Sequence, residues 1–304
     1  MRLEGIHHIT AITGDAQRNV DFYVETLGLR LVKKTVNYDQ PDVYHLYYGD
    51  EVGAPGSIMT FFEFPGAAPG RHSGGMIHTV VWRVPSAASL DFWAARLEAA
   101  GRPVTRHARR MLESTDPEGL GIALLVDDAT SDRPLTATAP GIPGEHALTG
   151  FHGVRAYATD PARSLTLLEA LGFERGPYAG TWAARGDQRH SVLSYDAPPA
   201  DGGIPGAGTI HHIAWASRDE DHERWRSVAG DAGARVTPII DRTYFRSIYF
   251  REPSGVLFEI ATLSPGFAVD EPADSLGRSL VLPPQYEPRR ADIERVLTPV
   301  TSPC

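Results

Sequence analysis

The sequence predicts an α+β protein of four β-α-β-β-β modules, which pair into two cup-shaped, eight-stranded mixed β-barrels with the helices outside. The main observation is an internal repeat, because the tetrapeptide Ile-His-His-Ile occurs at Ile6–Ile9 and again at Ile210–Ile213. Weaker forms of this opening begin at Met76 and Phe151. Each opening starts an apolar run that is followed by a helix-like segment and then by further β-rich runs.

The first module spans residues 1–70 and begins with a strand at Ile6–Thr13. Gly14 and Asp15 signal a helix start, and apolar residues then recur at helical spacing near Gln17–Thr26. Gly28 is expected to end this helix. Three β-rich runs separated by Gly and Pro complete the module: Leu29–Asn37, Val43–Tyr48 and Ser57–Phe64.

The second module, residues 75–128, repeats this order with a strand at Ile77–Val84 and a helix at Ala88–Ala100. Its remaining strands are expected at Val104–Ala108, Arg110–Thr115 and Ile122–Val126. The two modules form an N-terminal pair within residues 1–135. The segment Asp127–Glu145 is rich in Asp, Thr, Pro and Gly, which is typical of a linker.

The C-terminal pair occupies residues 146–304, with modules at 150–197 and 208–264 and a tail at 265–304. The third module is the least regular, and its expected elements are a strand from Phe151, a helix at Ala162–Leu171, and strands at Tyr178–Ala184 and Ser191–Asp196. The expected elements of the fourth are a strand at Ile210–Ala216, a helix at Asp221–Ala232, and strands at Val236–Ile240, Ser247–Arg251 and Val256–Leu263. A short helix near Arg290–Leu297 is expected in the tail, which would pack over the domain surface.

Composition limits the possible partners. The 304 residues carry a net charge of −9, which argues against nucleic acid or an anionic membrane as the main partner. The N-terminus lacks an apolar signal segment, and no apolar run is long enough to span a membrane. The only cysteine is Cys304, so intrachain disulfides and multi-thiolate metal sites are excluded. A cytoplasmic protein is expected, in which nitrogen and oxygen atoms would hold any metal.

The repeated histidine doublets indicate a metal site. Adjacent strand residues face opposite sides, so one histidine of each doublet can face a cavity, and two neighbouring strands would bring two imidazoles together. Glu259 lies in the apolar run SGVLFEIAT, where an unpaired carboxylate would be costly. A metal is slightly favoured as its partner over an arginine or the turn of its own hairpin. Two histidines and a carboxylate are typical of non-haem Fe(II) oxygenases, would also serve Mn(II), and occur in zinc hydrolases.

Nearly the whole chain resembles the vicinal oxygen chelate superfamily, and within it the ring-cleaving dioxygenases of the hydroquinone-cleaving type. The similar segments are GIHHITAITGDAQRNVDFYVETLGLRLVKKTVNYD, YHLYYGDEVGAPGSIMTFF, GTIHHIAWAS, SIYFREPSGVLFEIAT and DEPADSLGRSLVLPP. In that family the second histidine of each doublet and the glutamate of the last strand bind iron. The resemblance therefore implies that His8, His212 and Glu259 are the metal ligands.

The resemblance also implies that His7, His211 and Tyr249 lie beside the ligands without binding the metal. Arg242 is assigned less firmly, because its loop is shorter than the family pattern. Strand alternation turns His7 and His211 away from the metal unless a twist or bulge redirects them. Tyr249 is thus the first choice for the group that orients or deprotonates a ring hydroxyl, with His211 as its expected hydrogen-bond partner.

Three other residues have competing interpretations. Catechol-cleaving relatives take their first ligand from the third module, which would select His152, but the full doublet favours His8 and requires modules one and four to form the active cup. Glu63 has a strand position similar to that of Glu259 and is a candidate fourth ligand, although its place before Pro65 favours solvent exposure. His45, between tyrosines, would either line the cavity or take part in cross-strand packing.

These residues predict an Fe(II)-dependent, extradiol-type dioxygenase that cleaves a hydroquinone or related dihydroxylated aromatic ring and inserts both atoms of O₂. Mn(II) is the alternative metal. One alternative function is a glyoxalase-like, metal-dependent lyase or isomerase with a base such as Glu63. Another is a non-enzymatic module that binds an aromatic compound. The ring substituents and the oligomeric state are left open, with a homo-oligomer as one outcome.

Overall fold

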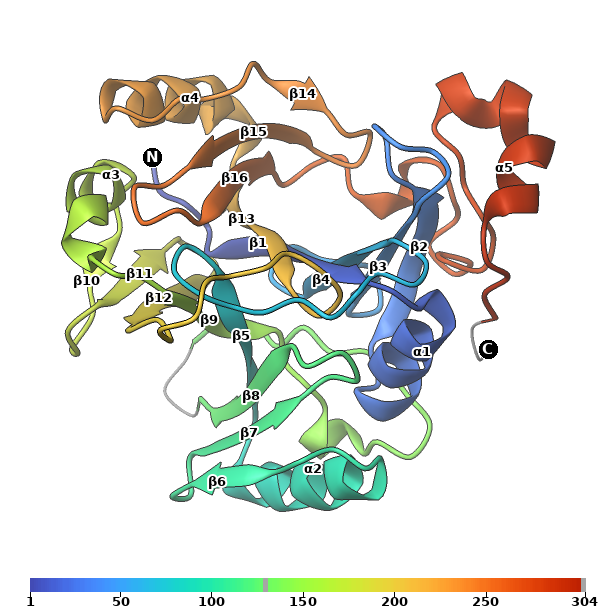
Figure 1. Cartoon of the computed structure of the whole chain (residues 1–304), viewed down its shortest axis with the longest axis horizontal. Helices are drawn as coiled ribbons and strands as arrows, with labels where there is room; N and C mark the ends of the chain where they lie inside the picture. The colour runs from blue at the N-terminus through green and yellow to red at the C-terminus, as the bar shows by residue number, and fades with distance from the viewer. Residues whose placement is uncertain (128–130, 302–304) are drawn as a thin grey trace.

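The computed structural model describes residues 1–127 and 131–301. Two eight-stranded sheets, each with parallel and antiparallel pairs, form the centre of the molecule, and the helices lie around them (Figure 1). This architecture confirms the predicted fold class. Cys304 and the predicted end of the second module at residue 128 lie outside the described residues. Among the helices of the described ranges, none is both long and apolar enough to cross a membrane.

The first sheet combines strands from the two ends of the chain. In spatial order its strands are β14 (Ile240–Asp241), β15 (Arg246–Arg251), β16 (Leu257–Thr262), β13 (Ile210–Ser217), β1 (Ile6–Thr13), β4 (Ile58–Glu63), β3 (Tyr44–Gly49) and β2 (Arg30–Val36). The second sheet takes its strands from the middle of the chain. Its order is β10 (Glu174–Arg175), β11 (Thr181–Arg185), β12 (His190–Asp196), β9 (Phe151–Tyr157), β5 (Ile77–Val84), β8 (Gly121–Val126), β7 (Met111–Thr115) and β6 (Thr105–His107).

The helices α1 and α2 begin where a short polar side chain caps them. Asp15 accepts a hydrogen bond from the Arg18 N–H at the start of α1, and Ser86 accepts one from the Ser89 N–H at the start of α2. The helices are α1 (Ala16–Val20), which continues as a π-helical segment η1 (Asp21–Thr26), α2 (Ala87–Ala99), α3 (Leu165–Ala170), α4 (His222–Asp231) and α5 (Arg290–Val296). Short 3₁₀ turns are η2 (Gly144–His146), η3 (Pro161–Ser164), η4 (Asp219–Asp221), η5 (Phe267–Val269) and η6 (Pro284–Arg289).

One predicted strand is wrong in most of its length. The run Val236–Ile240 is irregular up to the two-residue strand β14. Pro238 has no N–H to give to a strand ladder. Thr237 instead makes two separate contacts with Tyr249, because its backbone N–H donates to the Tyr249 carbonyl at 3.0 Å and its hydroxyl accepts from the Tyr249 N–H at 3.0 Å. The sequence pattern also misses β10, which is too short to show a period.

Each sheet is centred on an antiparallel pair of module-opening strands, β1 with β13 and β5 with β9. In the first pair, Ile6 and His8 face the consecutive residues Trp215 and Ala214, so His7 is an extra residue. On β13, His211 is likewise an extra residue, because the consecutive residues Thr10 and Ala11 face His212 and Ile210. Both histidines thus occupy β-bulges, which redirect side chains locally. The β5–β9 pair skips His78 and His152 at the matching places.

A substitution in the second sheet tests its close strand pairing. A Cβ atom on Gly153 of β9 would stand 2.1 Å from the Val192 carbonyl oxygen of β12. We expect Gly153→Ala to lower the free energy of unfolding by about 1–3 kcal/mol, which is typical of overpacking. Denaturant unfolding followed by circular dichroism measures this change. Gly230→Ala is the control, since nothing lies within 4 Å of its Cβ position in α4, and equal stability of both variants would contradict the prediction.

Candidate metal centre

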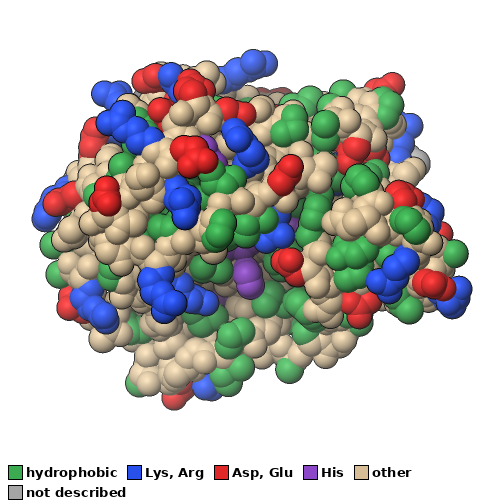
Figure 2. All heavy atoms as spheres, turned by 90° about the horizontal axis from the view of Figure 1, so that it is seen from above, with side chains coloured by type: hydrophobic (Ala, Val, Ile, Leu, Met, Phe, Trp, Pro, Cys, Tyr) green, Lys and Arg blue, Asp and Glu red, His purple; other side chains and the backbone are tan. Residues whose placement is uncertain are grey.

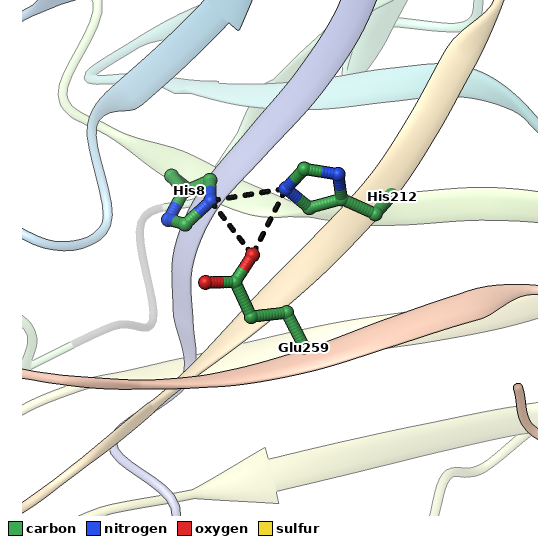
Figure 3. A group of neighbouring side chains, drawn as sticks. All are labelled: His8, His212 and Glu259. Carbon is green, nitrogen blue, oxygen red and sulfur yellow. Dashed lines mark hydrogen bonds and ion pairs between the residues drawn. The ribbon is translucent and has the colours of Figure 1, made fainter. Parts of the chain in front are cut away.

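His8, His212 and Glu259 come from the three adjacent strands β1, β13 and β16, and their side chains point toward one another (Figure 3). The two histidine Nε2 atoms are 3.2 Å apart. Glu259 Oε2 lies 3.2 Å from Nε2 of His8 and 2.9 Å from Nε2 of His212. All three side chains are at least 95% buried, with exposed fractions of 3%, 5% and 0%. The three atoms therefore form a compact, buried triangle.

The triangle has the dimensions of a metal-ligand set. Ligand atoms about 2.1 Å from one metal, at right angles to each other, lie about 3 Å apart. Glu259 Oε2 is buried, and among the described residues no donor approaches it along a hydrogen-bond direction. An unpaired buried carboxylate oxygen is costly without a cation. The other oxygen, Oε1, accepts a hydrogen bond from the Ser247 hydroxyl. Two imidazoles and one carboxylate oxygen thus fit a divalent metal with open positions for other ligands.

The bulge histidines determine which nitrogen of each neighbouring ring is free. His7 Nε2 lies 3.1 Å from the Thr262 carbonyl and must donate to it, so His7 Nδ1 is an acceptor. His7 Nδ1 is 2.9 Å from His8 Nδ1, which therefore carries a proton and leaves the lone pair of His8 Nε2 free. His211 Nδ1 lies 2.7 Å from His212 Nδ1 in the matching arrangement. Such contacts orient metal-binding imidazoles and increase their basicity.

Burial keeps these imidazoles neutral. It lowers the pKa of His7 to about 3 and that of His211 to about 4, and in each case the adjacent histidine lowers the pKa further. Burial also lowers the pKa of His212, although Glu259 partly opposes this. For Glu259, burial alone would raise the pKa, but the two imidazoles outweigh burial and hold the pKa well below its ordinary value. Near pH 7 the imidazoles of His7, His211 and His212 are therefore neutral and Glu259 is ionised, and metal ligands of these types bind in those forms.

Tyr249 and Arg242 form the wall next to the carboxylate. Tyr249 on β15 pairs with Glu259 in register, and its ring meets the His212 ring edge-on at 5.8 Å between centroids. Arg242 Nε donates to the Tyr249 hydroxyl at 3.3 Å, and the guanidinium lies over the ring. The expected contact between this hydroxyl and His211 is replaced by the one from Arg242. Burial and the Glu259 charge raise the pKa of Tyr249, so the phenol keeps its proton.

The triangle opens into a cavity of about 370 Å³, which is large enough for a small aromatic ring. Figure 2 shows histidine side chains in a hollow on one face of the molecule. The Phe245 ring packs against the rings of His7 and His8, at 4.9 Å between centroids in both cases, and covers these two histidines. The residues that line the cavity are His8, Ile12, Asn37, Tyr38, Asp39, His45, Tyr47, Phe62, Phe64, His211, His212, Arg242, Phe245, Tyr249 and Leu257.

Glu63 is not close to the triangle in the strand register. The residue of β4 that corresponds to Glu259 is Thr60, because Thr60 pairs with Thr10 as Glu259 pairs with Ala214. Glu63 Oε1 instead accepts a hydrogen bond from the Ala16 N–H at the start of α1, at 3.1 Å. The analogy drawn from the sequence between the two glutamates is therefore wrong by three residues.

His152 belongs to the second sheet. Its Nδ1 lies 3.1 Å from Asp127, which also accepts from the Arg83 guanidinium at 2.9 Å. Asp127, His152 and His190 lie close enough to share a metal, but Arg83 already supplies a positive charge to this group. By strand register, the second-sheet residues that correspond to His8, His212 and Glu259 are Thr79, Gly153 and Ser194. The second cup therefore lacks the donor set at the equivalent positions.

Sequence reasoning missed Ser247, the residue whose hydroxyl holds the outer oxygen of Glu259. It lies two positions before Tyr249 on β15, so strand periodicity places both on one face. This alternation is the sequence signal that could have identified Ser247 as a neighbour of the site.

Comparison with known proteins agrees with the fold. Residues 5–124 and 150–260 match the family described as the Glyoxalase/Bleomycin resistance protein/Dioxygenase superfamily. The chain is 43% identical over 303 residues to the Bacillus subtilis protein named "Putative ring-cleaving dioxygenase MhqO", covering 97% of this chain and 96% of that protein. It is 33% identical over 316 residues to the chlorohydroquinone/hydroquinone 1,2-dioxygenase of Sphingobium indicum, covering 97% and 96%.

Solved structures give the same picture. A crystal structure of a Bacillus subtilis protein named "putative dioxygenase" superposes with a TM-score of 0.92 at 40% identity and covers 99% of both chains. Glyoxalase I from Zea mays, at 16% identity, shares the fold with a TM-score of 0.58 over 85% of this chain and 92% of that one. These matches confirm the resemblance that the sequence motifs indicate. The chain belongs to the Glyoxalase/Bleomycin resistance protein/Dioxygenase superfamily.

Proposed function

We propose that this protein is an Fe(II)-dependent, extradiol-type ring-cleaving dioxygenase that acts on a hydroquinone or a related dihydroxylated aromatic and inserts both atoms of O₂. The observation that carries the proposal is the convergence of His8 Nε2, His212 Nε2 and Glu259 Oε2 on one point beside an aromatic-lined cavity. The relatives support the reaction class, since those named above are ring-cleaving or hydroquinone dioxygenases by name.

The donor set of two imidazoles and one carboxylate is typical of Fe(II) oxygenases, and its carboxylate would also suit Mn(II). Bound iron would supply a Lewis-acid and redox contact between an electron-rich ring and O₂. His7 and His211 would keep the coordinating nitrogens of the ligands unprotonated, through the Nδ1 contacts described above. Phe245 would exclude water from the ligand side of the cavity.

Tyr249 is the group that would hydrogen-bond to the substrate hydroxyl and take part in transfer of its proton. Its own hydroxyl is protonated at neutral pH and lies beside the Arg242 guanidinium, whose positive charge favours the phenolate form. It can therefore donate a hydrogen bond to the ring oxygen and can transiently take part in proton transfer. Arg242 acts through Tyr249, and its Nη1 lies 3.4 Å from Asp39, which also lines the cavity.

The two alternative functions, a glyoxalase-like enzyme and a non-enzymatic binding module, account for fewer features of the site. A glyoxalase-like lyase needs a carboxylate base in the cup, and Glu63, the candidate for that role, is hydrogen-bonded to the start of α1. A module that only binds an aromatic compound gives no reason for a buried carboxylate oxygen without a hydrogen-bond donor.

The decisive experiment is anaerobic reconstitution with Fe(II), followed by oxygen-electrode assays with hydroquinone, catechol and gentisate. We expect oxygen uptake and ring cleavage with hydroquinone, and incorporation of both atoms from ¹⁸O₂ into the product by mass spectrometry. Iron-loaded protein that consumes no oxygen with any of these diols would refute the proposed function.

Removal of the carboxylate ligand should release the iron. We expect Glu259→Gln to lower the affinity for Fe(II) by more than about 100-fold, because even residues that only orient ligands contribute about 10–100-fold. Glu63→Gln is the matched control, since it changes another buried strand carboxylate outside the triangle, and it should keep its iron. Iron content by mass spectrometry after gel filtration distinguishes the two. Equal retention of iron by both variants would exclude Glu259 as a ligand.

Loss of the Tyr249 hydroxyl should impair turnover without loss of metal. We expect Tyr249→Phe to reduce kcat by about 10²–10⁴-fold, the usual contribution of a positioned acid or base. The control is Tyr48→Phe, whose hydroxyl donates to Asn19 at 2.8 Å and faces α1 rather than the cavity. Steady-state oxygen uptake and iron analysis are measured on both. Wild-type turnover in Tyr249→Phe would show that its hydroxyl has no part in the reaction.

A further inference from the structure

One wall of the cavity carries a chain of four hydrogen-bonded side chains that the proposed reaction does not use. The Tyr47 hydroxyl is 2.8 Å from His45 Nδ1, and His45 Nε2 is 2.8 Å from the Thr60 hydroxyl. Thr60 in turn donates to the Thr10 hydroxyl at 2.9 Å. His45 and Tyr47 line the cavity, whereas the two threonines are fully buried behind them. The chain therefore presents its Tyr47 end and the His45 ring to a ligand.

All hydrogen bonds in this chain of side chains are donated in one direction, from Tyr47 toward Thr10. Thr60 gives its proton to Thr10, so it must accept the proton of His45 Nε2. His45 Nδ1 is then the acceptor, and Tyr47 donates to it. Burial lowers the pKa of His45 and raises that of Tyr47, so both are neutral near pH 7. The lone pairs of the Tyr47 oxygen remain, and they can accept a hydrogen bond from a substrate hydroxyl.

The fold does not require this chain, because the second sheet lacks it. By strand register, Tyr47, His45, Thr60 and Thr10 correspond to Glu113, Met111, Ala123 and Val81. Three of these four counterparts are apolar and cannot form such a chain. A buried polar chain has a desolvation cost, and only the cup that contains the ligand triangle has it. This difference between the two cups points to a role of the four side chains in the cavity.

The chain lies on the opposite flank of the cavity from Tyr249. The triangle is carried by β16, β13 and β1 at the middle of the sheet, with Tyr249 on β15 to one side and His45 and Tyr47 on β3 to the other. A ring bound by one oxygen near the triangle extends toward one of these flanks. A catechol has both oxygens on adjacent carbons at the bound end, whereas a hydroquinone has its second oxygen at the far end. Only the para isomer needs a polar group distant from the triangle.

We infer that the Tyr47 oxygen, held in place by His45, accepts a hydrogen bond from the distal hydroxyl of a para-dihydroxylated ring. These two residues thereby determine specificity for hydroquinones over catechols. The inference rests on the proposed function, and it assigns the substrate class to particular side chains. Neighbouring Phe62, whose ring lies 4.4 Å from that of His45 between centroids, would pack against the ring between its two oxygens.

The test is equilibrium binding to Fe(II)-loaded protein without oxygen, by calorimetry, with hydroquinone, catechol and phenol as probes. We expect the wild type to bind hydroquinone more tightly than phenol. Tyr47→Phe and His45→Met should each weaken hydroquinone binding by about three- to tenfold, the value of one hydrogen bond, while catechol and phenol binding stay unchanged. His45→Met introduces the side chain that β7 has at the equivalent place, and Tyr48→Phe on the same strand is the control.

The outcomes separate the inference from the proposed function. Equal affinity of the wild type for hydroquinone and phenol, or equal losses for all three probes in both variants, would overturn the specificity role. Unchanged hydroquinone binding in both variants would also overturn it, even if the wild type cleaves hydroquinone. Oxygen uptake by the wild type is measured in parallel. Its absence would refute the dioxygenase proposal independently of the binding pattern.

Discussion

The antiparallel pairing of β1 with β13 is the interaction on which the rest of the site depends. It joins segments about 200 residues apart in sequence, because His8 and His212 are separated by 204 positions. The ligand triangle therefore forms only when the two ends of the chain share one sheet. Each strand of the pair contains one bulge, at His7 and at His211, and strand twist increases at bulges. The bulges give His8 and His212 each an imidazole neighbour that a regular strand would turn to the other face.

Comparison of the two sheets shows which features of the site belong to the fold and which depend on particular side chains. It has the same central pairing with bulges at His78 and His152, so the bulged pair is a property of the module and not of metal binding. The two sheets differ in their side chains, because the second sheet has Thr79, Gly153 and Ser194 at the positions of the triangle residues. Gly153 could not become histidine without a shift of β12, because its Cβ position is occupied by backbone. Charge pairs occupy part of this cup instead, with Arg155 held by Glu113 and Asp196.

Much of this organisation could be predicted from the sequence, for physical reasons that differ by element. The strands Ile6–Thr13 and Ile77–Val84 have the predicted bounds, because their apolar runs are long and end at clear turn signals. The assignment of His8, His212 and Glu259 as metal ligands follows from the resemblance and not from periodicity, and it stays a prediction. The bulges could not be predicted, since a bulge changes which residue faces which without changing composition. For the same reason the partner of Tyr249 and the counterpart of Glu259 on β4 were assigned wrongly, since both depend on register between strands.

Charged and neutral side chains occupy different parts of the cavity wall, because different strands and loops supply them. Glu259, Arg242 and Asp39 place the formal charges beside the triangle and the Tyr249 flank. The two β3 side chains that line the cavity are neutral, because burial disfavours the charged forms of His45 and Tyr47 and hydroxyls satisfy both nitrogens of the imidazole. An asymmetric ligand would therefore be oriented by its own chemistry: the Arg242 guanidinium and a metal held by the triangle would attract the oxygen that becomes anionic, and an oxygen that stays protonated would be accommodated beside His45 and Tyr47. A neutral acceptor on the β3 flank can fix the orientation of a ring without competing for the metal.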